Sequence, residues 1–89
     1  MKTIERLVTM AAKTVVGSRK TIGNHSFKAC TFSNKIEFAY HGNVVCYWDR
    51  ETNSFRLDDC GWKGYPSTTR TLNDYKRILS TEYGAKELA

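Results

Sequence analysis

Residues 58–73 (DDCGWKGYPSTTRTLN) constrain the fold more than any other part of this 89-residue chain. The segment leads from a strand end, through a glycine-framed aromatic turn at Trp62, to Pro66, the only proline in the sequence. Proline has no backbone N–H and is tolerated at the start of a helix but not in its interior. A helix is therefore predicted to begin near Ser67 or Thr68, with one of their hydroxyl groups capping its free amides. Trp62 is expected to plug the open end of a small core.

Two segments show the spacing of apolar residues that is typical of an amphipathic helix. The first covers residues 3–16 within an N-terminal helical segment 1–20, and Gly17 is its stop signal. The second covers residues 67–83. The first helix has few large apolar side chains, so it is expected to pack on a sheet edge or a partner, including a second copy of the chain. The apolar stripes are Ile4, Leu7, Val8, Ala11 and Val15, and then Leu72, Tyr75, Ile78 and Leu79.

Between the helices, residues 24–62 change to the period of two that is typical of strands. Four short strands are predicted, and the apolar one at residues 44–48 is expected to be central. Their separators are Gly23–Asn24, residues 33–35, Gly42–Asn43 and the polar run 49–53. The sequence thus predicts a single α+β domain over residues 1–89. It consists of an N-terminal helix, a four-stranded antiparallel meander and a C-terminal helix, with both helices on one face.

The excess of basic side chains lies in the first half of the chain. Residues 1–44 contain seven basic and two acidic groups, whereas residues 45–89 contain seven of each, so the first half carries the whole net charge of +5. This asymmetry favours a polyanionic partner such as nucleic acid, although such a charge also serves simply to keep a small domain in solution. No apolar run approaches the roughly 18 residues of a membrane span, so no membrane association is expected.

The reactive side chains form no recognisable catalytic signature. Three cysteines, Cys30, Cys46 and Cys60, cannot form a closed disulfide framework, and they are expected to be small buried thiols in a reducing compartment. Zinc binding by these thiols with His25 and His41 is an open alternative, although no Cys-x-x-Cys unit is present. The two histidines stand at strand ends and are expected to be turn or surface residues. The sequence therefore predicts neither an enzyme nor a metal or cofactor site.

The candidate binding residues are cations that do not fit a core. On the second helix, Arg70 and Arg77 share one face and Lys76 lies beside it, while Lys63 stands between two aromatic residues. Cations near aromatic rings are what the binding of single-stranded nucleic acid uses, through phosphate contact and base stacking. The complete predicted nucleic-acid-binding set is Arg70, Lys76, Arg77, Lys63, Arg19, Lys20 and Lys28.

Several short motifs between residues 24 and 79 also resemble a family of small proteins encoded mainly by tailed bacteriophages. They are NHSF at 24–27, YHGNVV at 40–45, CGW at 60–62 and PSTTRTLN at 66–73. The first motif departs most from the family pattern, and a cysteine replaces a glycine in the third. The resemblance implies a phage protein of the host-cell cytoplasm. The resemblance assigns no site residues, because the family has no assigned biochemical activity.

Together, these features predict a non-catalytic phage accessory protein that binds nucleic acid or a nucleoprotein assembly in the infected cell. The alternative is an inhibitor that binds a host protein, such as a defence or transcription factor, through the sheet or the first helix. A homodimer through the first helix is compatible with either function.

Overall fold

The structure, a computed structural model, describes residues 2–14, 17–30, 34–59, 61 and 65–88. The predicted features at Val15, Cys60, Trp62 and Lys63 lie outside these residues. In chain order the elements are α1 (Lys2–Lys13), β1 (Arg19–Ile22), β2 (His25–Ala29), β3 (Lys35–Tyr40), β4 (Asn43–Asp49), β5 (Ser54–Leu57), α2 (Pro66–Glu82) and β6 (Lys86–Glu87).

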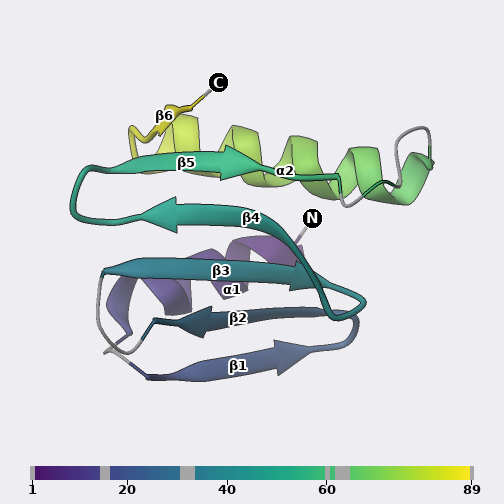
Figure 1. Ribbon diagram of the computed structural model, residues 1–89, viewed down its shortest axis with the longest axis horizontal. Coiled ribbons are helices and arrows are strands. Elements are labelled where there is room, and N and C mark those ends of the chain that lie inside the picture. The colour runs from purple at the N-terminus through teal and green to yellow at the C-terminus, as the bar shows by residue number, and fades with distance from the viewer. Residues whose placement is uncertain (1, 15–16, 31–33, 60, 62–64, 89) are drawn as a thin grey trace.

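All six of these strands form one sheet, in which they stand side by side in chain order (Figure 1). Neighbours from β1 to β5 are antiparallel, whereas β6 runs parallel to β5. The α+β class and the helices at both ends of the chain are confirmed. The prediction of four antiparallel strands is wrong, because the predicted meander β2–β5 gains a further strand at each edge.

The sequence pattern does not reveal β1 or β6 because neither alternates between apolar and polar residues. β1 begins at Arg19, inside the segment predicted to belong to the N-terminal helix, and its first three residues are exposed. β6 is two exposed residues long. Its register depends on backbone pairing with β5, in which Leu88 N–H donates to the carbonyl oxygen of Phe55 at 2.7 Å. Pairing with an existing sheet, and not local sequence, makes these segments strands.

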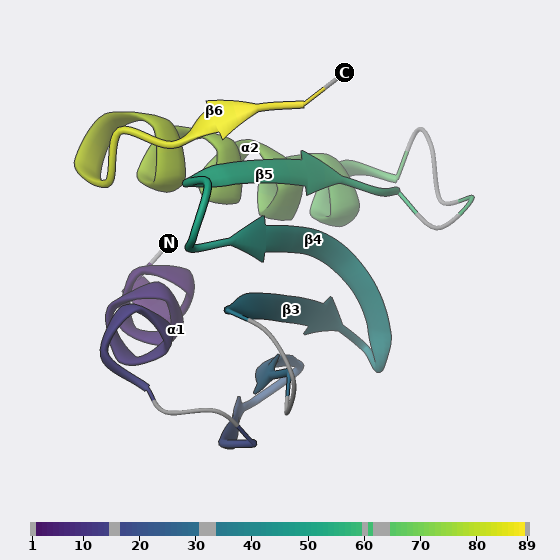
Figure 2. The same ribbon diagram turned by 60° about the vertical axis from the view of Figure 1, so that its left-hand side comes forward.

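Both helices lie on the same side of the sheet, and the opposite side is left open to solvent (Figures 1 and 2). On α1 the described part of the predicted stripe is buried, which confirms the pattern. On α2 the predicted Tyr75, Ile78 and Leu79 are buried, as are two threonines, Thr68 and Thr71, that the pattern did not include. The apolar side of α1 is therefore covered within the chain, which removes the reason for expecting a dimer through it.

The core lies between the helices and the covered face of the sheet. Its centre is Phe38 on β3, whose ring lies 4.8 Å from the ring of Tyr75 on α2 and 6.4 Å from that of Phe27 on β2. Trp48 on β4 is also buried and packs edge-on against Tyr83, beyond the end of α2. Aromatic pairs at these separations stabilise a fold beyond the apolar area that they bury.

The hairpin between β3 and β4 turns one residue earlier than predicted. Tyr40 pairs with Asn43, so the two turn residues are His41 and Gly42, with φ angles of 51° and 80°. A two-residue hairpin of this kind needs positive φ at both central positions. Two residues after Asn43, a register shift leaves Val45 as an extra residue in β4.

Helix α2 begins at the proline itself. Pro66 is the first helical residue, and Tyr65 occupies the N-cap position without a side-chain capping bond. The predicted cap at Ser67 or Thr68 is therefore wrong, since both residues lie inside the helix. Proline suits the first helical position because its missing N–H would have no partner there.

Candidate functional site

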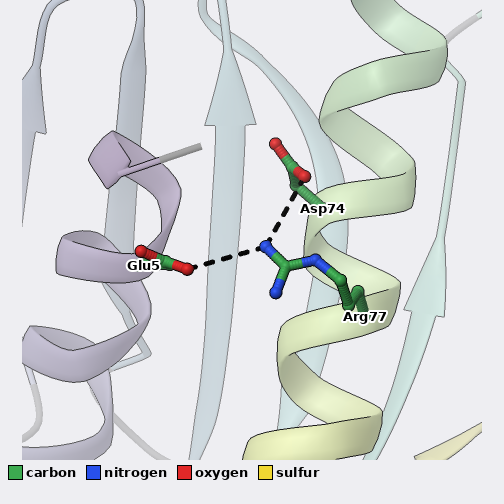
Figure 3. Close-up of polar contacts among 3 residues, drawn as sticks. All are labelled: Glu5, Asp74 and Arg77. Atoms are coloured by element: carbon green, nitrogen blue, oxygen red, sulfur yellow. Dashed lines mark ion pairs between the residues drawn. The ribbon is translucent and has the colours of Figure 1, made fainter.

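The predicted cation Arg77 joins the two helices. Its Nη2 lies 3.6 Å from Oε1 of Glu5 on α1 and 3.8 Å from Oδ1 of Asp74 on α2, as Figure 3 shows. About half of the Arg77 side chain is exposed, at 51%. Two carboxylates therefore compete with any phosphate for this guanidinium, and we assign Arg77 to the packing of α1 against α2.

The other predicted cations of α2 are also dispersed. Lys76 Nζ lies 3.3 Å from Oε1 of Glu87 on β6, which ties the end of the chain to the helix. Arg70 is exposed on the first turns of α2. Lys63 lies outside the described residues. The cationic face predicted for this helix is therefore reduced to Arg70, because Lys76 and Arg77 each have an acidic partner.

The cations predicted from the first half of the chain lie on the sheet. Arg19 and Lys28 are directly paired across β1 and β2, and both point to the open face. Lys20 pairs with the core residue Phe27, so it projects to the helix-covered side at the sheet edge. The predicted set is thus split between the two sides of the molecule, with Arg19 and Lys28 separated from the cations of α2.

A row of side chains that point to solvent crosses the open face through five strands. The strand registers place Arg19, Lys28, Glu37, Tyr47 and Arg56 next to one another, each on the next strand along the sheet. We call these five residues the cross-strand row. Directly opposed residues on one face of a sheet have Cβ atoms about 5 Å apart, so neighbours in the row can contact the same ligand.

The guanidinium of Arg56 lies over the ring of Tyr47, with Cζ 4.9 Å from the ring centroid. This is the geometry of a cation–π contact. Tyr47 is half-buried and Arg56 is exposed. The pair presents an aromatic ring and a cation together on the open face.

Two shallow hollows on the open face meet at Glu37. One, of about 320 Å³, is lined by Tyr47 and Arg56 among others. The second, of about 240 Å³, is lined by Arg19 and Lys28 among others. Every residue of the cross-strand row lines at least one of these hollows, and Glu37 lines both.

The open face is positively charged. Among the described residues, strand alternation gives it five basic side chains and two carboxylates, Glu37 and Asp49. Asp49 is engaged locally, because its Oδ1 accepts a hydrogen bond from the backbone N–H of Glu51 at 3.0 Å. The basic residues are Arg19, Lys28, Lys35, Arg56 and Lys86.

Sequence reasoning missed Tyr47, Arg56 and Glu37 as parts of one site. Tyr47 lies in the strand predicted to be apolar throughout, and Arg56 lies in a strand with no predicted role. Their alternation with core residues was a usable signal, because it places each on the face opposite the core. The alternation does not predict the strand register, and the register is what aligns Glu37, Tyr47 and Arg56 with Lys28.

A second cluster of polar rings lies where β2 and the β3–β4 hairpin approach α2. The ring of His25 stacks on the ring of Tyr40, with the two centroids 4.9 Å apart. The ring of His41, the next residue along the chain, has its centroid 4.3 Å from that of Tyr40. His25 is buried, with 8% of its surface exposed, so its prediction as a turn or surface residue is wrong. It opens β2 on the covered face, between β1 and β3. The prediction holds for His41, which is exposed in the turn.

Burial lowers the pKa of His25, and the neighbouring His41 lowers it further, while Asp74 acts in the opposite direction. Nδ1 of His25 has no hydrogen-bond partner among the described residues. Beside this cluster, a hollow of about 250 Å³ is lined by residues that include Ser67 and Thr68. Within the described part of the chain, neither hydroxyl is hydrogen-bonded to a histidine, so the cluster shows no activated nucleophile.

The cysteine thiols differ in their surroundings. Cys46 is fully buried in the core, and this burial raises the pKa of its thiol well above the ordinary range. Cys30 is half-buried at the end of β2. Cys60 lies outside the described residues. Across the residues that the structure describes, no three or more histidine, cysteine or acidic side chains gather as metal ligands would.

Neither helix is both long enough and apolar enough to cross a membrane, as judged over the described residues. Comparisons with protein-family models, with curated proteins and with solved structures find no match to this chain. The geometry and charge of the open face are therefore the features that bear on function.

Proposed function

We propose that this protein binds single-stranded nucleic acid on the open face of its sheet, without catalytic activity. The observation that carries the proposal is the cross-strand row, in which Arg19 and Lys28 lie in line with the Tyr47–Arg56 pair. Unpaired bases stack on aromatic rings and on guanidinium planes, while nearby cations contact the phosphates. The row supplies both kinds of contact on adjacent strands.

The shape of the face favours a single strand over a duplex. Recognition of duplex DNA commonly uses an element that projects into a groove, such as a helix in the major groove. Both helices of this protein lie on the far side of the sheet (Figure 2). The open face carries the two hollows and no projecting helix among the described residues. A flexible strand with exposed bases can follow such a surface.

The proposed site is on the open face of the sheet, whereas the sequence predicted binding by the cations of α2. Lys76 and Arg77 have acidic partners within the chain, whereas Arg19, Lys28 and Arg56 are exposed together on the open face. The resemblance to phage proteins is compatible with a role in an infected cell and stays a prediction.

The test compares two arginines that differ in position. Binding of a fluorescently labelled single-stranded oligonucleotide is measured by anisotropy for the wild type, Arg56→Gln and the matched control Arg70→Gln. We expect Arg56→Gln to weaken binding about tenfold and Arg70→Gln to weaken it less than about twofold, because only Arg56 provides both stacking and charge. If Arg70→Gln has the larger effect, the site lies on α2 instead.

Salt dependence provides a second readout. Each phosphate contact contributes about 0.7 to the slope of log affinity against log salt for a single strand, so three contacts predict a slope near −2. Affinity in the millimolar range or weaker at low salt, or no dependence on salt, would refute the proposal. Recovery of one stoichiometric protein from nuclease-treated host lysate, together with that failure, would favour the alternative of a host-protein inhibitor.

A further inference from the structure

Glu37 is the one carboxylate in the cross-strand row, and it stands where a phosphate-binding surface would be expected to have none. In the strand register Glu37 stands opposite Lys28 on β2 and opposite Tyr47 on β4. Its side chain is half-buried and lines both hollows of the open face. A negative charge here repels phosphates, so it weakens binding that depends on charge alone.

The residues that the structure describes leave the carboxylate of Glu37 without an internal contact. Within the described residues it forms no hydrogen bond and no ion pair, in contrast to Asp49, the other acid of the same face, which binds the backbone of its own loop. An ionised carboxylate is an acceptor with two oxygens and can take two donors at once. Glu37 therefore offers two free acceptor atoms beside the stacking pair Tyr47–Arg56.

The position of Glu37 suits the edge of a base that stacks on that pair. Glu37 and Tyr47 are directly opposed on neighbouring strands, so their Cβ atoms lie about 5 Å apart. A base stacked on the Tyr47 ring or on the Arg56 guanidinium extends over the adjacent strand. In a single strand its Watson–Crick edge is free for hydrogen bonding.

Among the four bases, guanine alone has two adjacent donors on this edge, N1–H and the N2 amino group. Adenine and cytosine place an acceptor beside their amino donor, and uracil or thymine has one N–H between two carbonyl oxygens. An acceptor-only carboxylate thus matches guanine at two atoms and meets an unpaired acceptor on each other base.

We infer that Glu37 makes the open face selective for guanine in single-stranded nucleic acid. This inference rests on the proposed function, and it assigns the base specificity of the same site. The remaining residues of the row then contact phosphate or stack, and Glu37 supplies the sequence preference.

The test measures the anisotropy of labelled oligothymidines that contain one central guanine, adenine, cytosine or thymine. Wild type is expected to bind the guanine oligonucleotide about tenfold more tightly than the thymine one. Glu37→Thr keeps a good strand former but shortens the side chain and removes the charge. We expect this variant to bind the all-thymine oligonucleotide more tightly than wild type and to lose the guanine preference.

The matched control is Glu82→Thr, which removes an equal charge from the exposed end of α2 on the other side of the sheet. It is expected to keep the guanine preference. Equal binding of all four oligonucleotides by wild type, with normal salt dependence, would overturn the role of Glu37 but leave the proposed function standing. Absence of binding to every oligonucleotide would instead refute the proposed function itself.

Discussion

At the scale of single residues, neighbours across the sheet decide what a side chain does. His25 looks like a strand-end residue in the sequence, yet it is buried against Tyr40 because β2 has strands on both sides. Tyr47 looks like a core residue, yet it points to the open face because its neighbours Cys46 and Trp48 point inward. In both cases the sequence indicates a strand. It does not indicate which face of the sheet the side chain occupies, or whether a helix covers that face.

The buried histidine predicts a loss of stability in acid. Since burial lowers the pKa of His25 in the folded protein, protonation favours the unfolded chain, where the pKa is about 6.5. The free energy of unfolding is therefore expected to be level above about pH 7 and to fall as the pH drops below 6.5 towards the folded pKa. Urea denaturation between pH 5 and 8 measures it.

Replacing the imidazole isolates this effect. His25→Leu should flatten the pH dependence between about pH 5 and 7, while His41→Asn in the exposed turn should retain most of it. A wild-type profile that stays level down to pH 5 would show that His25 is solvated in the folded protein.

At the scale of elements, Arg50 holds the C-terminal end of α1 to the sheet. Its Nη1 donates to the carbonyl oxygens of Ala11 and Thr14, each at 2.9 Å, and its Nε donates to that of Asn34 at 3.3 Å. The last carbonyls of a helix have no partner within it and carry the negative end of its dipole. The guanidinium of Arg50 thus binds the carbonyl of Ala11, in the last turn of α1, and that of Thr14, just beyond the helix. It also joins this end of α1 to Asn34, which precedes β3.

Removal of this contact should loosen α1. Arg50→Ala is expected to lower the free energy of unfolding by about 2 kcal/mol, because the partly buried carbonyls of Ala11 and Thr14 lose a charged donor. The matched control Arg6→Ala, on the exposed side of α1, should change it by less than about 0.5 kcal/mol. Equal effects of the two substitutions, measured by urea denaturation, would contradict this role.

At the scale of the whole molecule, one face of the sheet contributes to the stability of the fold and the other carries the proposed binding site. The two helices lie against one face of the sheet (Figure 1), and the hydrophobic core lies between them. The open face carries the row of cations around Tyr47. Strands β3 and β4 lie in the middle and contribute to both faces, whereas β1 and β6 form the edges. Mutations on the open face are therefore expected to alter binding with little effect on the core.

This arrangement predicts a gradient of local stability across the sheet. Amide hydrogen exchange should be slowest in β3 and β4, which are paired on both sides, and fastest in β1 and β6, which have one free edge each. Exchange measured by NMR checks this order residue by residue. Protection of β1 equal to that of β4 would indicate that another chain covers the β1 edge in solution.

Local chemistry by itself determined the two helices, the apolar stripe of each, the central position of β4 and the α+β class. These follow from periodicity and from residues such as Pro66, whose missing N–H allows it only at a helix start. They concern contacts a few residues apart, which the order of side chains encodes directly.

Only the tertiary structure decided the strands β1 and β6, the burial of His25 and the composition of the candidate site. Each depends on strand pairing, and strand register is a property of distant segments that must fit one core. Strand pairing aligned Lys28, Glu37 and Tyr47, whereas the packing of α1 against α2 gave Arg77 an acidic partner on the other helix. The members of the predicted cation set that the structure describes are exposed, but which of them lie together depends on the fold.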